Sequence, residues 1–254
     1  MLKNTIETFK IMNGSELNTE SENCMKLYRV GSIAAFLIAI LMFGEILVYA
    51  LIPNSDDPLE IFKLFNNSNL SGLLFFDLLG MISYILFIPF ILSLYMILKK
   101  SDRAILLPGT ILFFIGIAIF FANNTGFSVL RLSNQYDLAT TNEEKAMCIA
   151  ACKTMITLFD VNAFLVSYVL VSVAWTMISY VMLNSKIFIR KAAYAGLFAG
   201  LSGVIAEIIE NTLNQFLVIA ISFYFLAIVF LIIWVTLSGR QLYQMGFKYK
   251  NGIN

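Results

Sequence analysis

Six apolar runs, each near 20 residues long, constrain the fold of this chain more than any other feature. They cover residues 30–52, 72–98, 104–123, 160–183, 192–213 and 217–237. An α-helix of about 20 apolar residues crosses the hydrocarbon core of a bilayer, which is roughly 30 Å thick. The sequence therefore predicts an all-α membrane protein with six transmembrane helices.

The composition supports this class of protein. Of the 254 residues, 59% are hydrophobic and 13% are charged, whereas soluble domains have about 45–50% apolar and 25% charged residues. The first run follows 29 residues of more polar chain and is longer than the roughly 7–15 apolar residues of a signal peptide, so we expect it to remain as a membrane helix. The net charge of +1 gives no reason to expect nucleic acid as a partner.

The distribution of basic residues predicts the orientation in the membrane. Of the 17 Lys and Arg residues, 13 fall on the side that carries both termini, and the other side has Lys63, Arg131, Lys145 and Lys153. Basic residues are enriched on the cytoplasmic side of membrane proteins. We therefore expect a multi-pass protein of the cell membrane with a cytoplasmic lead-in at 1–29, a six-helix domain at 30–240 and a cytoplasmic tail at 241–254.

The longest connection, residues 124–159, is predicted to lie on the outer side. Thr141 and Glu144 have the spacing of a capping box, in which each side chain bonds the backbone amide of the other residue. A helix should therefore begin near Asn142 and continue into the fourth span, with part of it standing above the membrane.

The fifth apolar run carries a polar stripe. On a helix, one face collects residues spaced at i, i+3, i+4 and i+7, and here that face holds Gly196, Gly200, Gly203, Glu207, Glu210, Asn211 and Asn214. Glycines let a second helix approach closely, and a charged residue costs about 2.5–3.5 kcal/mol at mid-membrane. We therefore expect this face to look into the protein and Ala199 to lie on the lipid face.

Other polar residues fall at a similar height in the outer half. Asp77 lies about two turns inside the second run, too deep to cap that helix. Ionisable residues inside membrane helices are candidate functional groups, and Arg131 is the expected cation partner for one of them. The candidate ligand-binding residues are Glu45, Asp77, Asn124, Arg131, Asp160, Glu207, Glu210 and Asn211.

Simpler explanations of these residues stay open. Asp160 and Glu210 can be hydrated at the membrane boundary, Asn124 can merely end a helix, and the acids can serve only to pair helices. Trp234 is expected as an anchor at the lipid–water interface. Cys148 and Cys152 are expected to be two small apolar residues, because a disulfide within one helix is geometrically awkward.

The sequence contains no histidine, which excludes zinc sites with His ligands, Ser–His hydrolysis and haem bound by His. We expect no cofactor. The preferred function is an outward-facing acidic cavity that binds a cation, a proton or a small cationic or lipid ligand, for transport or sensing. Two alternatives remain: a membrane enzyme on a lipid substrate, whose carboxylates would suit Mg²⁺, Ca²⁺ or Mn²⁺, and an accessory protein without a site.

Two stretches carry a family resemblance. The segment 123–147 contains Asn124-Thr125, Ser133-Asn-Gln-Tyr136 and Ala139-Thr140 before an acidic–basic helix start, and the chain opens its first span with Leu27-Tyr-Arg-Val-Gly-Ser-Ile-Ala-Ala35. In these features it resembles a bacterial and archaeal family of six-helix membrane proteins that is known only as a domain of unknown function. The resemblance covers residues 26–240 and implies the fold and the membrane location, but no activity.

Overall fold

The computed structural model describes residues 2–52, 55–212 and 216–248, and these ranges contain helices and no strand. The N-terminal half comprises α1 Leu2–Leu51, α2 Pro58–Asn67, α3 Asn69–Phe75, α4 Leu78–Leu98 and α5 Arg103–Asn123. The rest comprises α6 Gly126–Leu138, α7 Asn142–Leu158, the π-helix η1 Phe159–Val166, α8 Ser167–Ser185, α9 Arg190–Thr212, α10 Leu217–Tyr243 and the π-helical turn η3 Gln244–Lys248.

Six helical stretches are long and apolar enough to cross a membrane. They are Glu22–Leu51, Leu78–Leu98, Arg103–Leu138, Asn142–Ser185, Arg190–Thr212 and Leu217–Phe247. The prediction of an all-α protein with six membrane-spanning helices is therefore confirmed. The predicted start of the second span at residue 72 is wrong, because the apolar run there is divided between α3 and α4.

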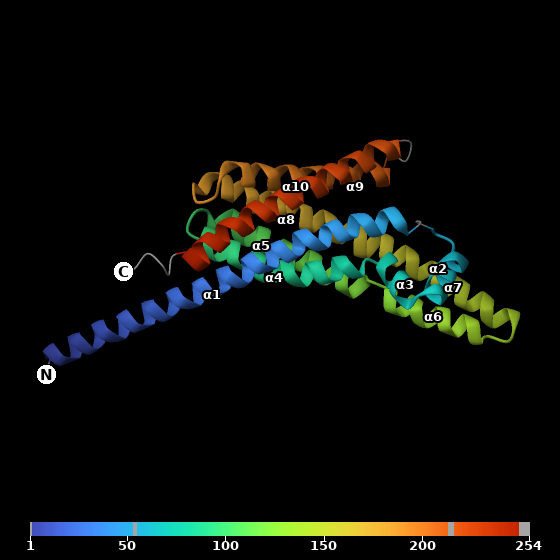
Figure 1. Ribbon diagram of the computed structural model, residues 1–254, viewed down its shortest axis with the longest axis horizontal. Helices are drawn as coiled ribbons and strands as arrows, with labels where there is room; N and C mark the ends of the chain where they lie inside the picture. Colours follow the sequence, from blue (N-terminus) through green and yellow to red (C-terminus); the bar gives the residue numbers. More distant parts are fainter. Residues whose placement is uncertain (1, 53–54, 213–215, 249–254) are drawn as a thin grey trace.

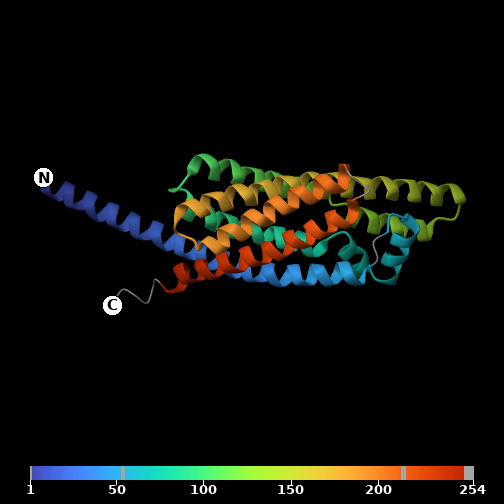
Figure 2. The same cartoon turned by 90° about the horizontal axis from the view of Figure 1, so that it is seen from above.

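The long helices lie side by side along one axis (Figure 1). One end of the bundle holds the α4–α5 and α8–α9 turns, the end of α10 and the point where α1 enters the bundle (Figures 1 and 2). The opposite end holds the short helices α2, α3, α6 and α7. We call these the inner end and the outer end. Because the number of spans is even, the chain enters the first span and leaves the last span at the same end of the bundle. The cytoplasmic location of the inner end remains a prediction from the charge distribution.

Helix α1 is a single helix of 50 residues, about 75 Å long at 1.5 Å per residue. This length exceeds the thickness of a bilayer, and the N-terminal part projects beyond the bundle at the inner end (Figure 2). The predicted lead-in is thus continuous with the first span.

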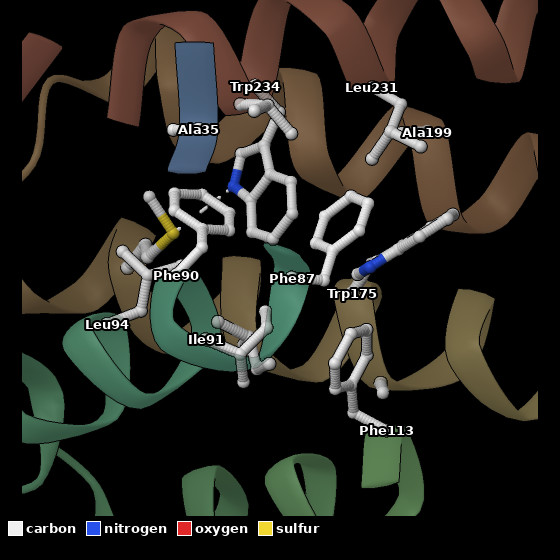
Figure 3. Close-up of a cluster of buried hydrophobic side chains, with 14 of the residues drawn as sticks. Ala35, Phe87, Phe90, Ile91, Leu94, Phe113, Trp175, Ala199, Leu231 and Trp234 are labelled. Atoms are coloured by element: carbon white, nitrogen blue, oxygen red, sulfur yellow. Dashed lines mark hydrogen bonds between the residues drawn. The ribbon is translucent and has the colours of Figure 1, made fainter. Parts of the chain in front are cut away.

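An aromatic core packs between the long helices of the bundle (Figure 3). The Phe90 and Trp234 rings pack edge to face, with centroids 5.4 Å apart, and Phe87 lies 5.8 Å from Phe113. Trp234 is fully buried, and its indole Nε1 donates to Met182 Sδ over 3.3 Å. The expectation that Trp234 anchors the interface is wrong, because α10 turns this face toward α4 and α8 rather than lipid.

A second core holds the short outer helices together. It contains Ile61 and Phe62 of α2, Val129 of α6 and Phe159 of η1, all buried. The capping box is confirmed, because the Thr141 hydroxyl accepts from the Glu144 amide at 3.2 Å and the Glu144 carboxylate accepts from the Thr141 amide at 3.2 Å. Helix α7 then continues through η1 into α8, as the sequence predicted.

The outer core also contains a cysteine. Cys152 is completely buried, and Cys148 packs beside the same cluster; both are free thiols. The expectation that these two cysteines act as small apolar residues is therefore confirmed.

Candidate functional site

The glycine stripe of α9 is a close-packing face, and its partner is α8. A Cβ atom added to Gly200 would overlap the Ser172 carbonyl oxygen and the Thr176 hydroxyl, and one added to Gly203 would lie 2.6 Å from Ser172 Oγ. The prediction that this face contacts another helix is confirmed. The contact with α8 also turns the polar end of the stripe toward the interior of the protein.

Helix α9 also buries the neighbouring face, which the sequence analysis had assigned to lipid. Ala199 is fully buried, so its predicted lipid exposure is wrong. The reason is that α9 packs against both α8 and α10, and small residues on two adjacent stripes admit both neighbours. Phe198, Leu201 and Ile208 form the exposed side of the helix.

Glu207 stands at the outer end of the glycine stripe and is the most buried acid of the candidate set, with 3% of its surface exposed. Its Oε2 accepts a hydrogen bond of 3.3 Å from Asn211 Nδ2. Its Oε1 is buried and accepts no hydrogen bond from the described residues. Buried polar atoms almost always have a partner, so this oxygen is an unused acceptor within the described part of the protein.

Glu210 lies one turn farther out and is half-buried. The Tyr224 hydroxyl of α10 donates to Glu210 Oε2 at 2.5 Å, and the same phenol lies close enough to Glu207 to interact with it electrostatically. The Tyr224 phenol thus hydrogen-bonds one carboxyl of α9 and lies near the other across the α9–α10 hairpin.

Glu45 and Asp77 form a second pair, between α1 and α4. Ser83 Oγ donates to Glu45 Oε1 over 2.9 Å. Asp77 is the N-cap of α4: it adopts a left-handed conformation with φ 57°, and its Oδ1 accepts from the Gly80 amide at 3.0 Å. The prediction that Asp77 lies too deep to cap the span is wrong, because α4 begins only at Leu78.

Tyrosines connect the two pairs. Glu45 and Asp77 lie within electrostatic range of each other, and Tyr168 of α8 lies within range of both Glu45 and Glu207. Tyr84 of α4 faces Asp77 and Tyr168. We call this set the acid–tyrosine cluster; its members are Glu45, Asp77, Glu207, Glu210, Tyr84, Tyr168 and Tyr224.

The groups that act on the buried acids of this cluster are neutral or acidic. They are the Ser83 hydroxyl, the Gly80 amide, the Asn211 amide, the Tyr224 phenol and neighbouring carboxyls. Within the part of the chain that the structure describes, no Lys or Arg is among them. The predicted partner Arg131 lies exposed on α6 and is not brought to the cluster.

The remaining candidates lie at the edge of the cluster. Asn124 Nδ2 donates to the Phe76 carbonyl over 2.8 Å, and its Oδ1 accepts from the Gly126 amide, so this residue fastens the α5–α6 junction to the end of α3. Asp160 is exposed on η1, with Asp56 and Glu210 as electrostatic neighbours. Asn211 is exposed beside Glu207, and Asn214 lies outside the described residues.

Sequence reasoning missed the tyrosines as members of the site. None was predicted as a candidate residue, yet the Tyr224 hydroxyl donates to Glu210 across the α9–α10 hairpin. Tyr84 follows Asp77 by seven residues, which places both on one helix face. A tyrosine that lies far from the end of a span and on the same helix face as an acid could have indicated membership of the site.

The cluster does not have the composition of a multi-carboxylate metal centre. Within residues 2–52, 55–212 and 216–248, no three His, Cys, Asp or Glu residues come together in a way that could hold a metal ion. A cavity of about 370 Å³ lies elsewhere, at the inner end between α4 and α5. The acids and phenols of the cluster can accept and donate protons or provide oxygen atoms to a small cation.

Comparisons with known proteins give one match. The family model described as "Domain of unknown function (DUF4386)" matches residues 30–243. No curated protein and no solved structure matches the chain.

Proposed function

The chain belongs to the DUF4386 family of unknown function, and we propose that its acid–tyrosine cluster binds a proton or a small cation from the outer side of the membrane, for transport or sensing. The observation that carries the proposal is the buried Oε1 of Glu207, one turn from Glu210, which has no hydrogen-bond partner among the described residues.

A positively charged ligand would compensate the negative charge of the carboxyls in the acid–tyrosine cluster. Buried charged groups in proteins are paired or coordinate a cation, and removing one partner of a buried pair is strongly destabilising. The cluster contains two pairs of carboxyls, and the groups acting on its buried acids include no basic side chain among the described residues. A bound proton or cation would therefore compensate the cluster and satisfy Glu207 Oε1.

The exposure of the acids supports access from the outer end. Asp160 is exposed, Glu210 is half-buried and Glu207 is buried, so the exposure of these acids falls from the outer end inward. Asp160 and Glu210 are also electrostatic neighbours. A cation that approaches from the outer end would therefore meet an exposed carboxylate first.

The side chains of the acid–tyrosine cluster indicate which class of cation it could bind. Hydroxyls, a side-chain amide and widely spaced carboxyls suit a proton, a monovalent ion or a small organic cation. Divalent ions favour several carboxylate or carbonyl oxygens in one shell. The proposed alternative of a metal-dependent enzyme acting on a lipid therefore has less support from these residues.

A helix-pairing role is the second candidate, and two contacts favour it. The Ser83–Glu45 hydrogen bond joins α4 to α1, and the Tyr224–Glu210 bond joins α10 to α9. In this case the acids would hold the bundle together and bind nothing.

Glu207→Gln separates the two candidates, because it keeps the shape of the side chain and removes the carboxylate. Thermal unfolding of the purified protein in detergent is measured against pH and against Na⁺, K⁺, Mg²⁺, Ca²⁺, Mn²⁺ and tetramethylammonium. A ligand at 100 times its Kd stabilises a folded protein by about 2.7 kcal/mol. We expect the unfolding temperature of the native protein to respond to pH or a cation, and this response to be lost in Glu207→Gln.

Glu143→Gln is the matched control, because Glu143 is an exposed acid of α7 outside the cluster. It should retain the native response. A response that persists unchanged in Glu207→Gln would refute the binding proposal. A uniform loss of stability in Glu207→Gln, the same under every condition, would favour the helix-pairing role instead.

A further inference from the structure

A second polar feature lies at the opposite end of the bundle, and we propose that it binds the phosphate group of an anionic phospholipid. It is the hollow of about 370 Å³ between α4 and α5, lined by Tyr95, Lys99, Lys100 and Arg103. We call it the basic hollow. It lies apart from the acid–tyrosine cluster, so the proposal is independent of the function proposed above.

The backbone beside the basic hollow is a short, hydrogen-bonded turn. Helix α4 ends at Leu98 and α5 begins at Arg103, so only four residues connect them. The Lys99 amide donates to the Tyr95 carbonyl at 2.9 Å, and the Ser101 amide donates to the Leu98 carbonyl at 2.8 Å. The three basic side chains therefore project from a tight turn that fixes their spacing.

The charge of the turn favours an anion. It has three basic residues and one acid, Asp102. The Asp102 carboxylate is already engaged as the N-cap of α5, where its Oδ1 accepts from the Ile105 amide at 3.2 Å. A guanidinium binds phosphate through paired hydrogen bonds and lysines add point charges, so the lining has the chemistry of a phosphate site.

The helix dipole accounts for two of these residues but not the third, whereas the general excess of basic residues at the inner end covers all three. Lys99 and Lys100 follow the C-terminus of α4, where cations interact favourably with the helix dipole. Arg103 is the first residue of α5, where the helix dipole disfavours a cation and favours an anion. A phosphate bound in the hollow would offset this unfavourable placement.

The position favours a lipid as the source of the phosphate. The hollow lies between the last turn of one membrane span and the first turn of the next. This position is at the level of lipid headgroups. Tyr95 is half-buried on its wall, and tyrosines are enriched at that level. Basic pockets between transmembrane helices on the cytoplasmic side are suited to anionic headgroups.

The α8–α9 turn offers a matched control. Lys186, Arg190 and Lys191 are exposed, equal in number to the basic residues of the hollow, and lie at the same end of the bundle (Figure 1). None of them lines the hollow. Neutralising them changes the charge of this membrane face to the same extent and leaves the hollow intact.

The test compares the full-length native protein with the triple variants Lys99→Gln/Lys100→Gln/Arg103→Gln and Lys186→Gln/Arg190→Gln/Lys191→Gln. Each is delipidated in detergent and titrated with phosphatidylglycerol or phosphatidylcholine, and bound lipid is counted by native mass spectrometry. We expect the native protein and the α8–α9 variant to retain phosphatidylglycerol preferentially, and the hollow variant to bind it about tenfold more weakly. Equal retention by both triple variants would refute the site.

Two further measurements keep the test decisive. Arg103→Gln alone should weaken lipid retention while leaving the lipid-free unfolding temperature equal or higher, because the change removes an unfavourable helix-end charge. A lower lipid-free unfolding temperature would contradict the dipole argument on which the site depends. Inorganic phosphate at millimolar concentration should stabilise the native protein less than phosphatidylglycerol does; equal stabilisation would overturn the assignment to a lipid.

Discussion

The inner and outer halves of this bundle are built on different physical principles. The inner half is held by aromatic packing around Phe90 and Trp234 and by glycines that bring α8 and α9 together. The outer half holds the acid–tyrosine cluster and a π-helical segment under a cap of short helices. Both halves have a hydrophobic core, but the acid–tyrosine cluster lies in the outer half alone, so mutations in the two halves should have different consequences.

The largest expected difference between the two ends is their sidedness. A reporter that is active only outside the cytoplasm should be silent when fused after Asn254 and active when fused at residue 60, because the basic residues favour a cytoplasmic inner end. Activity at both positions, or at neither, would contradict the six-span topology. Activity after Asn254 alone would show that the bundle is inverted.

The inner core should be the most sensitive to truncation. Trp234→Ala removes the largest fully buried side chain together with its contact to Phe90, and such truncations cost about 3–5 kcal/mol. Reversible unfolding in detergent with increasing denaturant measures the loss. Phe225→Ala is the control on the same helix, because Phe225 is 63% exposed; a comparable loss there would mean that burial does not determine the effect.

Overpacking at the α8–α9 contact should cost somewhat less. Gly200→Leu forces a side chain against the Ser172 carbonyl and Thr176, and overpacked cores typically lose about 1–3 kcal/mol. Ala118→Leu is the appropriate control, because Ala118 lies exposed on α5, whereas Ala199 is buried and unsuitable. Equal unfolding temperatures for the two variants would remove the evidence for close packing.

The features that the sequence predicted correctly depend on local rules. Span length follows from bilayer thickness, the start of α7 follows from the Thr141–Glu144 spacing, and the inward direction of the Gly200 face follows from helical periodicity. Each rule uses residues within one helix or at its end. These rules fixed the spans and placed Glu207 in the interior.

The failures occurred where the answer depends on a neighbouring helix. Ala199 and Trp234 are buried because α9 and α10 each contact more than one partner, which periodicity within one helix does not reveal. Asp77 was misplaced because a continuous apolar run hides the boundary between α3 and α4. The proximity of Tyr168 to both Glu45 and Glu207 depends on how α8 packs against its neighbours, which the sequence of α8 does not reveal.

The smallest expected effect concerns Arg131, and it tests whether the outer half is self-contained. Arg131 is exposed on α6 and is not among the groups acting on Glu45, Asp77 or Glu207. Exposed substitutions away from such contacts usually change stability by less than about 0.5 kcal/mol. Arg131→Gln should therefore leave both the unfolding free energy and the pH or cation response unchanged. An altered response would show that Arg131 reaches the acids in solution and would restore it as their partner.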